Sequence, residues 1–481
     1  AQRMGARMAD TTRTNERAGK RFMGGRIATP SAAVLMSVSL LISGCSSVSK
    51  LWDSDKPAEG YVAGFLGAVV ADEPRAAVVG RGVLASGGTA ADAAVAVAAT
   101  LWVTLPSRAG VGGGGACLVH NGDERSKGVP EAVIFMSQAP GSTAGADRPA
   151  AAPMMPRGLF LLNARYGKAR FESIIGVVEQ MARDGVPASR ALVRDLAVVA
   201  GPLAGDPGAR AVFFPGGKMI GEGEPLVQPD LAALLGNMRR AGVGDLYSGA
   251  MAQKFVEAAG QAGGGVTAAD LRAAMPRQAP ALTVEAAGEA TVSFLPAPAD
   301  GGVAAAAAYR VLAADASALR AAKERALAAA AESRGVGALG ALPASTSFSV
   351  IDSEGNAVTC ALTMGNLFGT GRMAQGTGVL LAAAPSAQSV PLLSAGMVTF
   401  RRSSTVRVIA SASGQEGAPV AVAQVLAASL VDRGKVAKID PAGAPEPGRV
   451  NIIACNGGVA EPGTCAWSAD PRGFGLATGS N

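Results

Sequence analysis

The feature that most constrains this fold is a strand–turn–strand segment that starts near residue 345. The run Ser345-Thr-Ser-Phe-Ser-Val-Ile-Asp352 leads into a polar turn, Asp352-Ser-Glu-Gly-Asn356, and a second apolar run begins at Ala357. A glycine-rich bend, Leu367-Phe-Gly-Thr-Gly371, follows that run. Short runs of this composition, separated by turn residues, are typical of neighbouring β-strands. The segment therefore predicts two β-strands joined by a polar turn.

Composition and charge limit the classes of protein that fit. Of the 481 residues, 49% are hydrophobic and 17% charged, which is enough for a large core and excludes wholesale disorder. The length suits two or three ordinary domains or one large α/β unit. The net charge is +6, but residues 1–50 contain eight Lys/Arg and two Asp/Glu and account for all of it. Nucleic-acid binding is therefore not predicted, because it needs a basic surface on the folded part.

The basic N-terminal stretch has the pattern of an export signal. It precedes a short apolar run, residues 32–42, that ends at Ser43-Gly-Cys45. The run is shorter than the roughly 20 residues of a membrane-spanning helix. Because Leu-Ile-Ser-Gly-Cys resembles the bacterial lipobox, we expect residues 1–45 to be a lipoprotein signal peptide and residues 46–58 a tether. The alternative is a buried helix with a chance cysteine.

Lipidation of Cys45 would anchor the chain to a membrane facing the bacterial periplasm, and Ser46 favours the outer membrane. The membrane, reached through that lipid, is the first expected partner.

Export places the remaining cysteines in an oxidising compartment. Cys455 and Cys465 lie in a Gly/Pro-rich polar segment and are expected to form a disulfide, whereas Cys117 and Cys360 lie in apolar strand patterns and are expected to be buried thiols. No CxxC or Cys/His spacing predicts a metal site. His120, the only histidine, follows a strand next to a turn and is expected to be a solvated edge residue.

Two further segments are predicted to be helices. One glycine run lacks the pattern of a phosphate-binding loop. Residues 85–101 carry small side chains at nearly every position, which allows close packing on all sides. Residues 313–334 form an Ala-rich helical stretch. The run Gly110-Val-Gly-Gly-Gly-Gly115 is not followed by Gly-Lys-Ser/Thr, so it does not fit a nucleotide-binding loop. No cofactor is predicted.

The segment that begins at Ser345 resembles the start of the small subunit of the γ-glutamyltransferases, which are N-terminal-nucleophile (Ntn) hydrolases. Where family members have Thr-Thr-His, this chain has Ser345, Thr346 and Ser347. In the family, self-cleavage frees the first residue as the nucleophile, and its α-amino group acts as the base. The resemblance implies Ser345 as candidate nucleophile and Thr363 as the second hydroxyl that hydrogen-bonds it. The alternatives are an uncleaved turn serine and a structural threonine.

Further matches run in family order over about residues 60–475. They include the glycine run above, residues 158–167, residues 246–252 with 265–271, and the Pro296–Gly302 turn. The resemblance implies an α+β fold, the Ntn αββα four-layer sandwich, with two mainly antiparallel sheets between layers of helices. It also implies a large-subunit-like region, residues 59–344, and a small-subunit-like region, residues 345–481.

The residues that would recognise a γ-glutamyl group differ from the family pattern. Met136 stands where the family has the arginine for the substrate carboxylate, and a thioether cannot replace a guanidinium. Ala387 replaces an acid that holds the substrate ammonium, and Gly365 replaces a pocket asparagine. A zwitterionic γ-glutamyl substrate is therefore not expected.

The oxyanion region also departs from the family pattern. Its paired glycines align with Glu416 and Gly417, and its paired serines align with Ser394 and Ala395. Gly417 and Ser394 are the remaining oxyanion candidates, while a carboxylate at Glu416 would oppose a developing negative charge.

Because the frame is kept and the pocket is not, the first expectation is a lipid-anchored periplasmic protein that acts as a non-catalytic structural or interaction subunit. A protein partner in a membrane-associated complex would then be its second partner. Two alternatives stay open. One is an Ntn amidohydrolase or acylase that uses Ser345 on an apolar or neutral acyl group, and the other is a residual γ-glutamyltransferase (glutathione hydrolase).

Overall fold

The computed structural model describes residues 64–122, 128–400, 405–431, 435–436 and 441–480. The expected signal peptide, the lipidation site Cys45 and the tether 46–58 lie outside the described residues. Residues 60–481 form one compact unit, and all that follows concerns the described part of it.

The first sheet has seven strands among the described residues, in the order β19-β1-β9-β10-β2-β3-β6. All its neighbouring strands are antiparallel. The strands are β1 (Gly67–Ala71), β2 (Gly114–His120), β3 (Glu131–Phe135), β6 (Arg277–Pro280), β9 (Thr346–Asp352), β10 (Ala357–Thr363) and β19 (Leu476–Ser480). The predicted pair is confirmed as β9 and β10, with residues 353–356 as its turn.

The second sheet has six described strands in the order β18-β17-β14-β13-β8-β7, again antiparallel throughout. They are β7 (Leu282–Glu285), β8 (Ala290–Phe294), β13 (Ser394–Phe400), β14 (Thr405–Ser413), β17 (Arg449–Cys455) and β18 (Cys465–Ala469). Two-residue strands form three small pairs: β4 (Val186–Pro187) with β5 (Pro225–Leu226), β11 (Met373–Ala374) with β12 (Val379–Leu380), and β15 (Leu430–Val431) with β16 (Lys435–Val436).

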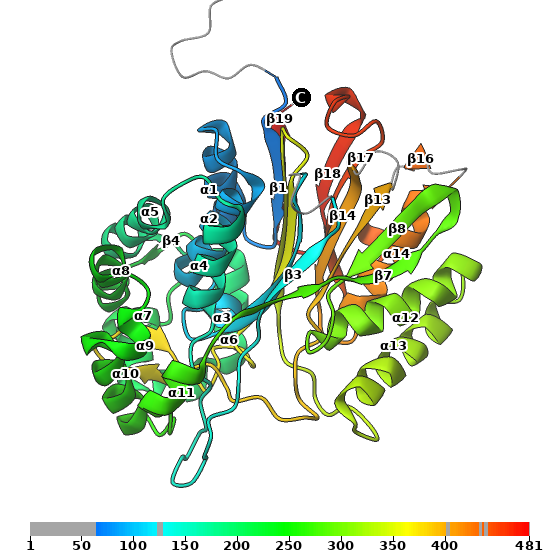
Figure 1. Cartoon of the computed structure of the whole chain (residues 1–481). Coiled ribbons are helices and arrows are strands. Elements are labelled where there is room, and N and C mark those ends of the chain that lie inside the picture. The colour runs from blue at the N-terminus through cyan, green and yellow to red at the C-terminus, as the bar shows by residue number, and fades with distance from the viewer. Residues whose placement is uncertain (1–63, 123–127, 401–404, 432–434, 437–440, 481) are drawn as a thin grey trace, which may run out of the picture. The chain divides into compact units, whose positions relative to one another are not determined.

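Helices cover the outer face of each sheet (Figure 1). On the first sheet lie α1 (Pro74–Ala85), α2 (Ala90–Thr104), α3 (Pro106–Ala109), α4 (Met155–Tyr166), α5 (Phe171–Asp184), α6 (Arg190–Ala204), α7 (Pro207–Phe213), α8 (Pro229–Ala241), α9 (Asp245–Ser248), α10 (Ala250–Gln261) and α11 (Ala268–Ala273), with α5 and α8 packed behind α2. On the second sheet lie α12 (Asp300–Ala314) and α14 (Gly417–Ser429), and α13 (Leu319–Arg334) packs against these two helices. The expected α+β Ntn αββα sandwich is confirmed.

Strand β9 shows how the sequence fills these layers. Its side chains alternate, so Phe348 and Val350 enter the core under α2 while Ile351 faces the second sheet. Ser349 also faces that sheet, where its hydroxyl lies 3.1 Å from the Ser411 hydroxyl of β14. The two sheets therefore meet partly through polar contacts, and these contacts lead toward the N-terminal end of β9.

Two helix boundaries differ from the expectation. The small-residue helix begins at Ala90 rather than residue 85, because Thr89 and Asp92 form a capping box that starts α2 there. The Ala-rich stretch is two helices, with α12 ending at Ala314 and α13 starting at Leu319. Between them Asp315 accepts hydrogen bonds from the backbone N–H and the hydroxyl of Ser317, which stabilises a turn instead of a continuous helix.

Candidate active site

Ser345 lies directly before β9 and lines a cavity of about 400 Å³. Its walls include Ser413 at the end of β14, Gly414 and Gln415 in the turn that follows, and the loop that carries Phe474. Ser345 is only 2% exposed. The cavity, called here the Ser345 cavity, therefore lies where the start of a strand in one sheet meets the end of a strand in the other.

Thr363 acts on the peptide bond that precedes Ser345. Its hydroxyl, at the end of β10, donates a hydrogen bond of 2.7 Å to the carbonyl oxygen of Ala344 and accepts one of 3.0 Å from the N–H of Gly365. Because the hydroxyl accepts a hydrogen bond from Gly365, its own proton is directed to the carbonyl oxygen of Ala344. The hydroxyl therefore polarises the carbonyl that adjoins Ser345.

Asp72, just after β1, fixes the start of β9. Its carboxylate accepts hydrogen bonds from the Thr346 hydroxyl at 3.0 Å and the Ser347 N–H at 2.9 Å. The side-chain amide of Asn451, on β17, donates to Asp72 at 2.7 Å and to the Ser347 carbonyl at 3.0 Å. The sequence analysis missed both residues, because nothing in their local sequence places them beside β9.

Arg108 is a fixed cation beside Ser345. Two of its nitrogens bind the Asp195 carboxylate at 2.7 Å each, and a third lies 3.4 Å from the Ser345 carbonyl oxygen. Burial opposes its charge, but the hydrogen bonds and charge of Asp195 outweigh that effect and raise the pKa of Arg108. The guanidinium therefore stays charged and holds the Ser345 backbone in place.

The charged residues that line the Ser345 cavity are Asp72 and four arginines, Arg108, Arg194, Arg449 and Arg472. Three of the arginines are already paired with carboxylates: Arg108 with Asp195, Arg449 with Glu446, and Arg472 with Asp470 and Glu446. The guanidinium of Arg194 lies 5.1 Å from the centre of the Phe474 ring. The cavity therefore has little net positive charge with which to select an anionic ligand.

Neither oxyanion candidate is among the residues that line this cavity. The N–H of Gly417, in the first turn of α14, donates to the Gly414 carbonyl at 2.9 Å. The Ser394 hydroxyl is fully buried and lies within hydrogen-bond distance of two backbone carbonyls, those of Gly301 and Leu392. Glu416 pairs with Lys323 of α13, 3.5 Å between Oε1 and Nζ. The carboxylate that the sequence placed against the oxyanion is thus neutralised by an amine.

Two glycines line the Ser345 cavity, Gly414 and Gly473, and Gly414 lies in the turn before α14. The backbone at Gly414 requires a glycine. It has φ +108°, a region that favours glycine, and a side chain there would meet the Pro447 carbonyl at 2.2 Å. Its neighbour Gln415 also has a positive φ, 51°, and its side-chain amide holds the Leu342 carbonyl at 2.7 Å. This turn between β14 and α14 is a further feature that the sequence analysis missed, and Ser413-Gly-Gln415 was its only local signal.

The altered pocket positions separate into two groups. Met136 and Ala387 line a second cavity of about 420 Å³, called here the Met136 cavity, which shares no lining residue with the Ser345 cavity. Gly365 instead takes φ +78°, and a side chain built on it would meet the Ala383 carbonyl at 2.7 Å. An asparagine would not fit there without a backbone shift.

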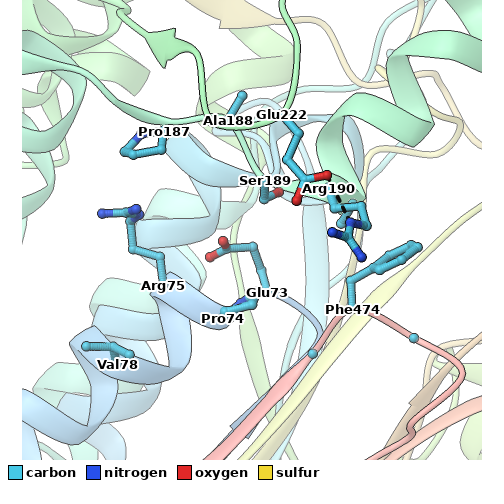
Figure 2. A pocket seen from close by; sticks show the side chains of 14 residues that line it. Glu73, Pro74, Arg75, Val78, Pro187, Ala188, Ser189, Arg190, Glu222 and Phe474 are labelled. Carbon is cyan, nitrogen blue, oxygen red and sulfur yellow. Dashed lines mark hydrogen bonds and ion pairs between the residues drawn. The ribbon is translucent and has the colours of Figure 1, made fainter.

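A third pocket, of about 680 Å³, adjoins the Ser345 cavity across Phe474 (Figure 2). Figure 2 shows Arg190 and Glu222 joined by an ion pair, 2.9 Å between Nε and Oε2, near the Phe474 ring. Glu73 lies at its floor and caps α1. Burial raises the pKa of the Glu73 carboxyl, although hydrogen bonds from the Ala76 N–H and other donors lower it in part.

Comparisons with known proteins place this architecture. A family model for gamma-glutamyltranspeptidase matches residues 76–334, which is more than half of the chain. The chain belongs to the gamma-glutamyltranspeptidase family.

Among curated members of the family, the chain is 31% identical over 247 residues to glutathione hydrolase 3 of Arabidopsis thaliana, and 27% identical over 255 residues to the glutathione hydrolase proenzyme of Escherichia coli (strain K12). Each match covers 49% of this chain, and they cover 38% and 43% of the two relatives. The fold is similar to that of cephalosporin acylase from Bacillus halodurans, with a TM-score of 0.67 and 18% identity over 89% of this chain and 99% of that one.

The disulfides of this gamma-glutamyltranspeptidase-family chain correct one prediction and confirm another. Cys455 and Cys465 are bonded, as expected. Cys117 and Cys360 were expected to be free buried thiols, but they also form a disulfide. The reason is strand register: β2 pairs with β10 so that these two cysteines lie directly opposite each other.

His120 was also placed wrongly by the sequence. It is only 2% exposed, not solvated, because β2 is flanked by β10 on one side and β3 on the other. Within the described ranges, no group of three or more His, Cys, Asp or Glu side chains is arranged to hold a metal ion. Among the same residues, none of the helices combines the length and apolarity needed to cross a bilayer.

Proposed function

We propose that this chain is a self-processing Ntn amidohydrolase whose nucleophile is Ser345 and whose acyl substrate is not a zwitterionic γ-glutamyl group. One observation carries the proposal: the Thr363 hydroxyl binds the Ala344 carbonyl oxygen at 2.7 Å, directly before the serine that would attack it. A hydroxyl beside a polarised carbonyl of its own chain is the arrangement that self-cleavage requires.

The chemistry balances with residues of this chain and one water molecule. The Ser345 hydroxyl oxygen bonds to the Ala344 carbonyl carbon, the C–N bond breaks, and the hydroxyl proton moves to the nitrogen. Water then hydrolyses the resulting ester and frees the α-amino group of Ser345. In turnover, this amine takes the proton of the same hydroxyl as its oxygen bonds to the carbonyl carbon of a substrate amide. The substrate C–N bond breaks as the amine passes that proton to the leaving nitrogen, and water then hydrolyses the acyl-enzyme ester to release the acid and restore the hydroxyl.

The substrate class follows from the altered pocket. Ala387 offers no carboxylate to hold a substrate ammonium group, and Met136 offers no guanidinium to hold a substrate carboxylate. Three of the four arginines that line the Ser345 cavity are paired with carboxylates, so the cavity has little net charge and suits an apolar or neutral acyl group. Relatives named glutathione hydrolases support the reaction type, amide hydrolysis, and the changed residues argue against the same substrate.

A second candidate is the non-catalytic structural subunit. It is favoured by positions 136, 365 and 387, where Met136, Gly365 and Ala387 replace the recognition side chains of the family. Under either function, we propose that lipid on Cys45 anchors the protein in the periplasm, where a protein partner can join it in a membrane-associated complex.

One experiment separates the two functions. Full-length protein purified from bacterial membranes is analysed by reducing electrophoresis and intact mass, beside a Ser345→Ala variant. The enzyme proposal expects cleavage between Ala344 and Ser345 in the wild type only, and hydrolysis of neutral acyl anilides at least a hundredfold above the variant. An uncleaved wild-type chain without turnover would refute the enzyme proposal and support the non-catalytic subunit.

Anchoring is tested separately. Mature protein should begin at Cys45, carry acyl chains by mass and partition into the detergent phase, because two or three chains attach a protein stably where one does not. Cys45→Ser should leave an unlipidated precursor. A mature terminus well beyond Cys45 without lipid mass would refute the anchor.

A further inference from the structure

Residues 336–344, called here the strap, lie between α13 and β9 and end at the peptide bond before Ser345. None of these nine residues is charged, and they are only Val, Gly, Ala, Leu and Pro. Leu339 and Leu342 are half-buried and pack against the core between the second sheet and its helices. The strap is therefore a neutral, apolar peptide that lies at the candidate nucleophile.

The backbone of the strap is held by side chains from other segments. The Gln415 side-chain amide, in the turn before α14, donates to the Leu342 carbonyl at 2.7 Å. The Ser389 hydroxyl donates to the Ala341 carbonyl at 2.7 Å. The Thr363 hydroxyl holds the carbonyl of the last strap residue, also at 2.7 Å. These three groups, called here the strap donors, bind a row of backbone carbonyl oxygens.

The strap donors can serve a second peptide in the same way. Backbone carbonyl oxygens are acceptors that every peptide carries, so the donors do not depend on the strap's own side chains. The bonds from Gln415 and Ser389 lie at the molecular surface, where a peptide from solution reaches them once the strap has left. Gln415 and Ala344 also line the Ser345 cavity, so the row of donors leads to the nucleophile.

The proposed self-cleavage makes the strap the first acyl group of this site. The ester formed on Ser345 carries the chain up to Ala344 as its acyl part, and turnover forms the same kind of ester with the acyl part of a substrate. Hydrolysis of the first ester cuts the covalent tie between strap and Ser345, while the strap donors remain on their own elements. The groups that hold a peptidyl acyl group are then available to the next one.

We infer that the turnover substrate is a neutral peptidyl amide, bound on its acyl side by the strap donors, with a small residue at the cleaved amide and an apolar residue two positions before it. The inference rests on the proposed function and adds the substrate class to it. The Ser345 oxygen bonds to the carbonyl carbon of the last residue, and the C–N bond to the amine breaks. The amine takes the proton that the α-amino group received from the hydroxyl, and water releases the peptide acid.

The test measures how hydrolysis depends on the length of the peptide. The probes are the p-nitroanilides of acetyl-Ala and of acetyl-Gly-Ala-Leu-Pro-Ala, with full-length protein in detergent and the Ser345→Ala variant as background. Only the longer probe reaches Gln415 and Ser389. Its kcat/KM should exceed that of the shorter probe at least about tenfold, because one neutral hydrogen bond is worth roughly two- to tenfold. A strap that competes for the donors lowers both values equally, so their ratio is unaffected.

Variants of the donors test the contacts one by one. Gln415→Asn suits the positive φ at that position but is one carbon too short, so the ratio should fall severalfold, as it should in Ser389→Ala. The two changes together should remove most of the gain from length. Gln424→Asn is the matched control, since the Gln424 amide on α14 donates to the Gly443 carbonyl at 3.1 Å, outside the strap. Its ratio should equal that of the wild type.

Reducing gels of the same samples report self-cleavage, so the inference and the proposed function can fail separately. A cleaved, active chain with a ratio near one, or a ratio that survives the double change, would overturn the inference alone. An uncleaved chain without turnover would overturn both. A further probe needs no variant: Asp in place of Leu in the longer peptide should lower wild-type kcat/KM at least about tenfold, because a charged side chain cannot replace the half-buried leucine. Equal rates would contradict a neutral acyl group.

Discussion

At the scale of single residues, the hydroxyl of Thr363 is the group on which the proposed self-cleavage would depend most directly, because it binds the carbonyl oxygen of Ala344. We predict that Thr363→Val slows cleavage before Ser345 by about a hundred- to thousandfold, the usual cost of losing one donor to a reacting carbonyl. Thr363→Ser keeps the hydroxyl and should cleave at a rate close to wild type. The measurement is the fraction of cleaved chain over time on reducing gels.

This prediction has an internal check on folding. Valine also removes the acceptor for the Gly365 N–H, which costs roughly 1 kcal/mol of stability and leaves the fold in place. Wild-type cleavage in a folded Thr363→Val protein would mean that another group polarises the Ala344 carbonyl.

Glu73 carries a pH dependence whose sign follows from its burial. In the unfolded chain the carboxyl ionises near 4.5, while burial in the folded protein raises its pKa. Its contribution to stability is therefore complete below pH 4.5 and is lost as the pH rises through the raised pKa. Glu73→Gln keeps an acceptor for the Ala76 N–H and the Thr104 hydroxyl, so it should remove this loss.

Unfolding in urea between pH 4.5 and 7 measures the effect. The free energy of unfolding should fall less steeply with pH in Glu73→Gln than in the wild type. Some fall remains in the variant, because burial also raises the pKa of Asp352. Identical pH profiles for the two proteins would show that ionisation of Glu73 does not destabilise the folded protein.

The candidate site residues came from the family resemblance, and the structure shows which of them lie together. The hydroxyl of Thr363 bonds the carbonyl oxygen of Ala344, directly before Ser345. The oxyanion candidates Gly417 and Ser394 are not among the residues that line the Ser345 cavity, whereas Gly414, three residues before Gly417, is. An alignment across a turn has no hydrophobic period to fix it, so the sequence could not indicate which of these residues faces the cavity.

At the scale of elements, the disulfide between β2 and β10 joins residues 243 apart in sequence. In the chain-entropy model, a loop of that length contributes about 5 kcal/mol, against about 3 kcal/mol for the ten-residue loop of Cys455–Cys465. In an uncleaved Ser345→Ala background, replacing both Cys117 and Cys360 with Ala should lower the melting temperature more than replacing Cys455 and Cys465. An equal or smaller drop would show that β2 and β10 hold without the bond.

The sequence could not predict this pairing, for a reason that applies to the whole sheet. Alternation and turn residues indicated that β9 and β10 are strands and that they are neighbours. Nothing local indicates that β2 lies beside β10 or that β1 lies beside β9, since those partners are more than 200 residues apart in the chain. The disulfide and the burial of His120 both depend on that long-range neighbour.

At the scale of the whole molecule, the two subunit-like regions are interleaved and not stacked as separate domains. In the first sheet, β1 and β2 come from residues 59–344, while β9 and β10 between them come from residues 345–481. In the second sheet, β8 from the first region pairs with β13 from the second. The family resemblance predicted the sandwich correctly, and the interleaving explains why a cut before Ser345 would leave the fold intact.

The Cys117–Cys360 disulfide joins the chain segments on either side of the proposed cut and therefore determines whether the fragments of a cleaved chain separate on a gel. Cys117 precedes the Ala344–Ser345 bond and Cys360 follows it, so the two fragments of a cleaved chain should stay covalently joined. Without reductant the cleaved protein should therefore run as one band and show the mass of the intact chain plus one water molecule. With reductant it should separate into two fragments. Cys117→Ala should separate under both conditions, and separation of the wild type without reductant would show that the bond between the regions is absent.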